Sequence, residues 1–271
     1  MQLFYQRFNA QEYLLFTLLS IAALVLVANF IGPDKGEVTT NWLSIILSSV
    51  VMFLSVSMVS KYGLKGNHGK AWILFMLFSA YWFCAETVDV LYDVVLGSEP
   101  WEYADDFFYI TGYQLFFSSL VFYLRPFAKQ ISKKMVGAIT FASLILLIPS
   151  LFMIVDSDSW DSNLLILISY PILDSIILIP ALIGIILFLK GGVNFMVSLL
   201  SLGIITQIIG DNSILFLSLQ NNYYPGHLAE VLFLWTYALF AFGLYHQIGF
   251  FSEKPNKNTC PSCGTTCSGH K

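Results

Sequence analysis

The sequence predicts an all-α membrane protein, a polytopic bundle of eight transmembrane helices. Hydrophobic residues make up 57% of the chain and charged residues only 11%, whereas soluble domains carry about 25% charged residues. Eight apolar runs are each long enough to cross the hydrocarbon core of a bilayer, which takes about 20 helical residues. The basic residues also fall in alternate loops between these runs, as expected of a multi-pass protein.

The spans follow one another with short loops, none of which is long enough to form a domain. The first run exceeds the usual apolar segment of a signal peptide and lacks a clear small-residue cleavage site, so we interpret it as a retained span. Residues 1–251 therefore form one transmembrane domain, and residues 252–271 form a tail. The predicted spans are 13–32, 40–60, 71–97, 106–124, 136–155, 164–189, 193–219 and 228–250.

The distribution of basic residues predicts the orientation. With eight spans, every Lys and Arg of the 13 in the chain except Lys35 falls on one side of the membrane. Because basic residues accumulate in cytoplasmic loops, both termini are predicted to be cytoplasmic, in the cell membrane. The opposite loops are rich in acids, among them Asp34, Glu37 and Asp105.

Carboxylates also occur within the spans, in what this orientation makes the outer half of the membrane. In the stretch "CAETVDVLYD" (84–93), Glu86, Asp89 and Asp93 are spaced by three and four residues, which places them on one helix face. A carboxylate near the centre of a membrane helix costs roughly 2.5–3.5 kcal/mol. The predicted core of this acidic group is Glu86, Asp89, Asp174 and Asp211, and its rim is Asp93, Asp106 and Glu230.

No Lys or Arg lies in that half of the spans, so ordinary salt bridges do not neutralise these acids. Three explanations remain: some acids carry protons, they share a cation (a metal ion or a ligand amine), or they line a water-filled vestibule. A plainer alternative is that each is a hydrogen-bonded contact between helices. The convergence of several spans favours a polar pocket, with Tyr113, Tyr170 and Tyr237 orienting its carboxylates by hydrogen bonds.

Metal chemistry in this pocket is only weakly indicated. Several carboxylates could supply the oxygen ligands that calcium takes. A catalytic zinc site usually needs two or three histidines, and the outer half offers only His227. The sequence therefore disfavours a histidine-dependent intramembrane hydrolase.

A weak internal similarity is compatible with a duplicated four-helix unit, with halves 1–130 and 131–251. The segments "ADDFFYITGY" (104–113) and "LAEVLFLWTY" (228–237) both place a tyrosine seven residues after an acid. "LSIIL" (43–47) similarly resembles "DSIIL" (174–178). Parallel duplication would put a shared pocket between the halves.

Four segments occur in a familiar order: "EPWEYADDFFYITGYQLFF" (99–117), "SYPILDSIILIPAL" (169–182), "IIGDNSILFL" (208–217) and "GHLAEVLFLWTYALFAFGLYH" (226–246). Over about residues 70–250 the chain resembles the eight-span membrane region at the N-terminus of many bacterial diguanylate cyclases, phosphodiesterases and histidine kinases. That resemblance implies a sensory input region. Two features depart from the pattern: only about twenty residues follow the last span, and Glu230 stands where an aspartate is expected.

The tail "CPSCGTTCSGHK" (260–271) carries four soft metal ligands, Cys260, Cys263, Cys267 and His270. They are close enough to complete a tetrahedral zinc or copper site. The alternatives are an unfolded tail that binds metal adventitiously and a thiol redox switch, since a cytoplasmic location favours reduced thiols.

The leading hypothesis is a membrane sensor or interaction module, acting in signal transduction, that binds a cation or small polar ligand in an acidic pocket. A structural or accessory subunit of a larger membrane complex, a cation- or proton-coupled transporter and an intramembrane metal-dependent enzyme are the alternatives. No soluble enzyme signature is present, so an enzyme is the less favoured class. The expected partners are the lipid bilayer and a separate signalling or membrane-complex protein, not nucleic acid.

Overall fold

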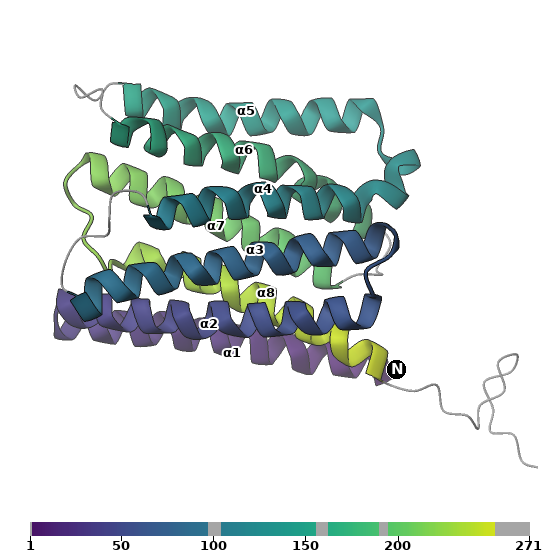
Figure 1. The fold of residues 1–271 in the computed structure, drawn as a ribbon, viewed down its shortest axis with the longest axis horizontal. Helices are drawn as coiled ribbons and strands as arrows, with labels where there is room; N and C mark the ends of the chain where they lie inside the picture. The colour runs from purple at the N-terminus through teal and green to yellow at the C-terminus, as the bar shows by residue number, and fades with distance from the viewer. Residues whose placement is uncertain (1, 97–103, 156–161, 190–194, 253–271) are drawn as a thin grey trace, which may run out of the picture.

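A computed structural model of the chain describes residues 2–96, 104–155, 162–189 and 195–252. Over these ranges the fold is all-α, as predicted, and eight helices are long and apolar enough to cross a membrane. They run roughly parallel to one another along the long axis (Figure 1). The helices are α1 (Gln2–Ile31), α2 (Pro33–Tyr62), α3 (Gly66–Val90), α4 (Ala104–Leu124), α5 (Lys133–Val155), α6 (Ser162–Leu189), α7 (Phe195–Leu219) and α8 (Val231–Ser252).

Three short segments extend these helices: the π-helical Leu91–Leu96 after α3, and the 3₁₀ turns Arg125–Gln130 and Leu228–Glu230 after α4 and before α8. Hydropathy placed the start of α2 too late. Helix α2 begins directly after Gly32, with Pro33 in its first turn and Asp34 beside it. Proline suits the first helical turn, and an acid there interacts favourably with the helix dipole. These residues therefore begin the helix, although a hydropathy criterion excludes them because they are polar.

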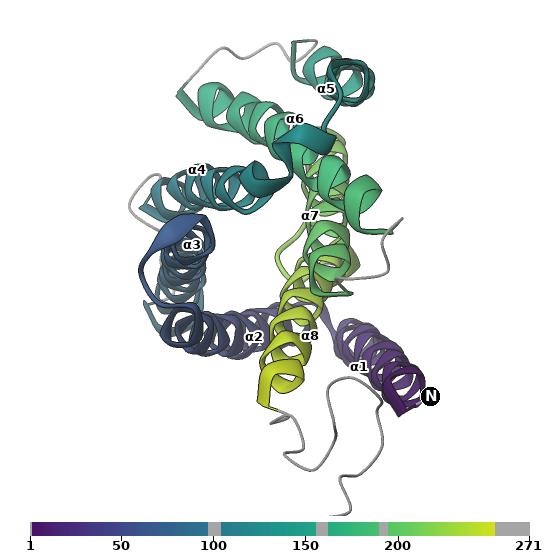
Figure 2. The same ribbon diagram turned by 90° about the vertical axis from the view of Figure 1, so that its right-hand side faces the viewer.

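Six of the helices close into a ring. Within each half, consecutive helices pack against one another, and the halves meet through α2 with α8 and α4 with α6. Following these contacts gives the closed order α2, α3, α4, α6, α7, α8 (Figure 2). Helix α1 packs outside the ring against α2 and α8, and α5 packs outside it against α6 and α7.

This arrangement is the one expected of two four-helix repeats. The outer helix comes first in each half, and each junction joins the second helix of one half to the fourth helix of the other. The duplication itself remains a prediction. The outer helices expose large apolar side chains, including Phe16 and Phe30 on α1 and Phe141 and Phe152 on α5. Such faces are suited to contact with lipid.

The core contains a tightly packed aromatic cluster in the middle of the ring. Phe75, Phe78, Phe116 and Phe240 are each at most 1% exposed. The rings of Phe78 and Phe116 stack with centroids 4.3 Å apart. Hydrogen bonds between Ser55 and Ser79 and between Thr206 and Thr236 add polar contacts across α2–α3 and α7–α8, a common feature of membrane helix pairs.

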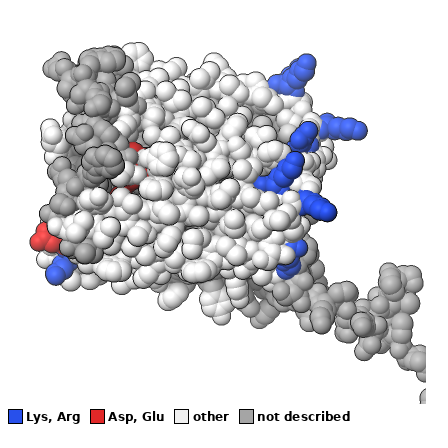
Figure 3. All heavy atoms as spheres, viewed as in Figure 1, with Lys and Arg blue, Asp and Glu red and all other residues white. Residues whose placement is uncertain are grey.

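Basic side chains gather at one end of the bundle, as Figure 3 shows for one face. They include Lys61 at the end of α2, Lys129 after α4 and Lys133 at the start of α5. The carboxylates within the spans lie toward the opposite end. This asymmetry is what the positive-inside pattern requires, while the orientation in a membrane remains a prediction.

Candidate functional site

A cavity of about 380 Å³ lies inside the ring, in the half of the bundle away from the basic end. Every ring helix contributes to its wall, and neither outer helix does. The lining residues are Asn41 and Ser44 from α2, Glu86 and Asp89 from α3, Asp105, Tyr109 and Tyr113 from α4, Tyr170 and Pro171 from α6, Gln207, Asp211, Ile214, Leu215 and Ser218 from α7, Tyr223, Pro225 and Glu230 from the connection that follows, and Phe233 and Tyr237 from α8.

Most of the predicted acids meet at this cavity. Glu86, Asp89, Asp211 and Glu230 line it directly, although they come from three separate parts of the chain. Asp105, predicted only as a loop acid, lines it as well. Among the described residues, the wall contains no Lys, Arg or His, so the charge that these residues contribute is entirely negative or neutral.

On one side of the cavity, two tyrosines hold the acids of α3. The Tyr237 hydroxyl donates to Glu86 Oε1 at 2.6 Å, and the Tyr109 hydroxyl donates to Asp89 Oδ2 at 3.2 Å. Glu86 is only 9% exposed. Tyr237 thus makes the kind of hydrogen bond to a carboxylate that was predicted for it, and Tyr109 makes a similar one.

On the other side, one tyrosine lies between two acids. The Tyr113 hydroxyl oxygen is 2.6 Å from Asp211 Oδ2 on α7 and 2.9 Å from Asp174 Oδ1 on α6. The Gln207 amide approaches both Asp211 oxygens, at 3.4 and 3.3 Å. Asp174 does not line the cavity. It lies behind Tyr113, 2% exposed, and its Oδ2 atom has no hydrogen-bond partner among the described residues.

The rim acids Asp106 and Glu230 are also held by hydrogen bonds. Tyr170 donates to Asp106. Glu230 Oε1 accepts from the Tyr223 hydroxyl at 2.8 Å and from the Gly226 backbone N–H at 2.7 Å. These bonds order the turn that leads into α8, so Glu230 has a structural role besides its place on the wall.

Gly226 is required in this turn, because its φ is +81° and a Cβ there would lie 2.0 Å from the Glu37 nitrogen. His227, the histidine predicted in the outer half, caps this turn: its Nδ1 atom accepts a hydrogen bond from the Ala229 N–H at 3.1 Å.

Two parts of the predicted site lie outside the described residues. They are the Asp93 side chain and the whole tail ligand set of Cys260, Cys263, Cys267 and His270. Within the described ranges, no group of three or more His, Cys, Asp or Glu side chains is placed to hold a metal ion.

Directly beneath the tyrosines of the cavity wall lies a layer of aromatic rings, called the floor here, whose Trp82 and Phe78 do not themselves line the cavity. Trp82 packs edge-on against Tyr113, Tyr109 and Tyr237, with ring centroids 5.5 to 6.0 Å apart. Phe78 lies directly beneath it, 4.6 Å away by ring centroids, and leads into the buried aromatic cluster. The acidic space is thereby separated from the basic end by closely packed rings.

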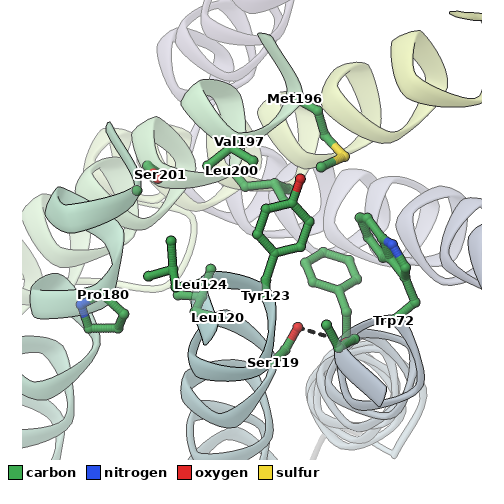
Figure 4. A pocket seen from close by; sticks show the side chains of 13 residues that line it. Trp72, Ser119, Leu120, Tyr123, Leu124, Pro180, Met196, Val197, Leu200 and Ser201 are labelled. Atoms are coloured by element: carbon green, nitrogen blue, oxygen red, sulfur yellow. Dashed lines mark hydrogen bonds between the residues drawn. The ribbon is translucent and has the colours of Figure 1, made fainter. Parts of the chain in front are cut away.

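A second, much smaller space of about 20 Å³ lies in the basic half between α3, α4, α6 and α7 (Figure 4). Its wall is apolar apart from a few groups. Ser119 donates to the Ala71 carbonyl at 2.8 Å, whereas Ser201 Oγ has no partner among the described residues. A space of this size is sufficient for about one water molecule, so it is a packing void rather than a ligand site.

The sequence missed the contributions of Asn41, Ser44, Phe233 and Tyr223 to the wall. Nothing in their local pattern separates them from other small or aromatic residues in apolar helices. Comparisons of the chain with protein-family models, curated proteins and solved structures found no match.

Proposed function

We propose that this multi-pass protein is a sensory or interaction module of the cell membrane whose acidic cavity binds a small ligand carrying a positively charged nitrogen. The observation that carries the proposal is the wall of the cavity: four predicted acids from α3, α7 and the turn before α8 converge on one space, to which no basic side chain of the described ranges contributes. In the proposed orientation, with cytoplasmic termini, this space lies in the outer half of the membrane.

Size favours an organic ligand over a bare ion. Pockets for small molecules span about 300–1,000 Å³, and this cavity, at about 380 Å³, falls in that range. The described carboxylates are also too dispersed to form a metal-ligand cluster. An ammonium group can instead be attracted by several carboxylates at once without a fixed coordination geometry.

The aromatic wall favours the same class of ligand. Five tyrosines and Phe233 line the cavity. Tyrosine and phenylalanine rings attract cations placed over their faces, a contact that contributes about 0.5–2 kcal/mol depending on desolvation. Acids with adjacent rings are therefore a suitable environment for an alkylammonium group.

A closed floor supports binding rather than transport. Trp82 and Phe78, each buried, pack against each other beneath the tyrosines of the wall, on the side of the basic end. A transporter needs a path to the opposite side in at least one state. The resemblance to membrane regions of signalling enzymes supports a sensory role, with output through a separate partner protein.

The test is calorimetric titration of the purified protein with methylammonium, tetramethylammonium and 1,4-diaminobutane. We expect saturable binding by at least one compound and at least a tenfold loss of affinity in Glu86→Gln and in Asp211→Asn. Asp34→Asn, an exposed acid at the start of α2, is the matched control and should bind like the native protein. Equal affinity in all four proteins would contradict the proposal. Saturable uptake by reconstituted vesicles would replace it with transport.

A further inference from the structure

We infer that Asp174, Tyr113 and Asp211 form a proton-binding site, in which one proton is held by the two carboxyl groups, and that a cation in the cavity competes with it. The second part rests on the proposed function, while the first does not. The three residues come from α6, α4 and α7, so the site lies where three ring helices meet.

The donors and acceptors of Tyr113, Asp174 and Asp211 determine how many protons the three side chains share. The Tyr113 oxygen is within hydrogen-bond distance of a carboxyl oxygen on each acid. A phenol has one proton and can donate it once, whereas an ionised carboxylate can only accept. If both acids were ionised, one of them would face the tyrosine oxygen without a proton between them. One acid must therefore carry a proton, which it donates either to the Tyr113 oxygen or directly to the other carboxyl group, since the two carboxyl groups are themselves within hydrogen-bond reach.

Burial identifies the acid that holds this proton. Asp174 is 2% exposed, and its Oδ2 atom has no partner among the described residues. An ionised carboxylate with an unpaired buried oxygen is far more costly than a neutral acid. Asp211 lines the cavity and is approached by Gln207, and its contact with Tyr113 is the shorter one. Short bonds are typical of an ionised acceptor. Asp174 is therefore the acid that holds the proton, and Tyr113 donates its own proton to ionised Asp211.

The equivalent place around Tyr237, on the opposite side of the cavity, lacks this arrangement of two acids and one tyrosine. There Tyr237, at the equivalent place in α8, donates to Glu86 alone. The similarity between "LSIIL" and "DSIIL" places Leu43 where Asp174 stands. One phenol proton is sufficient for one carboxylate, so the Tyr237 side requires no additional proton.

As far as the chain is described, the groups around this site do not supply a competing positive charge. Tyr170 and Asp106 lie nearby on α6 and α4, Glu86 and Asp89 face the same cavity from α3, and Tyr237 faces it from α8. Along α5, residues 135–155 contain no titratable side chain. A cation that enters beside Asp211 is thus the first positive charge near the shared proton, and it favours release of that proton to the solvent.

The first test needs no ligand. Infrared spectra of the native protein at neutral pH should contain the carbonyl band of a protonated carboxylic acid that is lost in Asp174→Asn. In Tyr113→Phe the band should persist but shift, since the contact between the Asp174 carboxyl group and the Tyr113 hydroxyl is gone. Asparagine mimics the neutral acid in shape and hydrogen bonding, so the first variant is expected to fold. The difference between the native infrared spectrum and that of Asp174→Asn should contain this band. If the band is missing from the difference spectrum, the proton site is overturned.

The second test measures proton release. Methylammonium chloride is added to the weakly buffered protein with a pH-indicator dye, and sodium chloride at equal ionic strength is the control. The native protein should release protons in proportion to bound methylammonium, and Asp174→Asn should release none. Binding without release would overturn the competition. Absence of binding by methylammonium and by both other compounds of the calorimetric titration would overturn the proposed function, and with it the competition; if only another of these compounds binds, proton release is measured with that compound. The infrared result still decides whether the proton site exists.

Discussion

The hydroxyl of Tyr237 lies 2.6 Å from Oε1 of Glu86, a residue 151 positions earlier in the chain, and joins the last span to the third. The Tyr113 hydroxyl similarly joins the fourth span to Asp211 in the seventh. In both cases a tyrosine of one half contacts an acid of the other. The acidic cavity is therefore a product of the assembly of both halves and not of either half alone.

We predict that Tyr237→Phe destabilises the protein by about 1–3 kcal/mol, because Glu86 loses its hydrogen-bond donor while remaining buried. Tyr245→Phe is the control, since Tyr245 is on the same helix and 70% exposed. The free energy of unfolding in detergent, measured for both variants, checks this. If the control loses as much free energy of unfolding as Tyr237→Phe, the hydrogen bond to Glu86 does not contribute specifically to stability.

Gly112→Ala should also be destabilising, by about 1–3 kcal/mol, because a Cβ at Gly112 would lie 2.4 Å from Cδ1 of Trp82. This collision would move the indole that forms the cavity floor. At Gly137 no atom lies within 4 Å of an added Cβ. Gly137→Ala should therefore be neutral or stabilising, in line with the higher helix propensity of alanine. Thermal unfolding of both variants distinguishes the two sites, and equal effects would argue against close α3–α4 packing.

The proposed orientation predicts which residues are accessible from outside the cell. In a variant without native cysteines, Lys35→Cys should react with a membrane-impermeant maleimide in intact cells, since Lys35 lies at the end opposite the basic cluster. Lys129→Cys should react only after the membrane is permeabilised. The reverse pattern would invert the protein and place the cavity in the inner half.

The tail hypothesis predicts metal in the purified full chain and its loss on truncation after residue 255, because Cys260, Cys263, Cys267 and His270 are then absent. Elemental analysis for zinc and copper measures this. Cys84→Ser, which removes an exposed thiol within a span, should retain the metal. Metal that persists after truncation would assign it elsewhere and exclude the tail site.

Much of the fold was predictable because the membrane imposes a simple requirement on each span. A helix in lipid must be about 20 apolar residues long, whatever it packs against, so each span could be recognised locally. The position of the acids along the bundle was predictable for the same reason: the rise per residue places Glu86, Asp89 and Asp211 at similar levels of their helices, and all three line one cavity. Their meeting at one cavity follows from depth and from the cost of facing lipid.

The remaining features depend on contacts between distant residues. Nothing in the local sequence of α2 and α8, or of α4 and α6, indicates that these pairs close the ring, because the choice of partner depends on how the buried side chains fit together. Asp174 and Asp211 have similar apolar surroundings in sequence, yet only Asp211 reaches the cavity. Asp105 was predicted outside the membrane because it precedes an apolar run, although α4 already begins at Ala104.

The central claim is that a cationic ligand occupies the acidic cavity, and covalent labelling tests it most directly. The native protein is irradiated with a photoreactive primary amine, with and without excess methylammonium, and the labelled peptides are located by mass spectrometry. We predict protectable labels on wall residues such as Tyr109, Asp211 and Phe233, from three different helices. Labels confined to the lipid-facing surfaces of α1 and α5, or labels not reduced by methylammonium, would contradict the account.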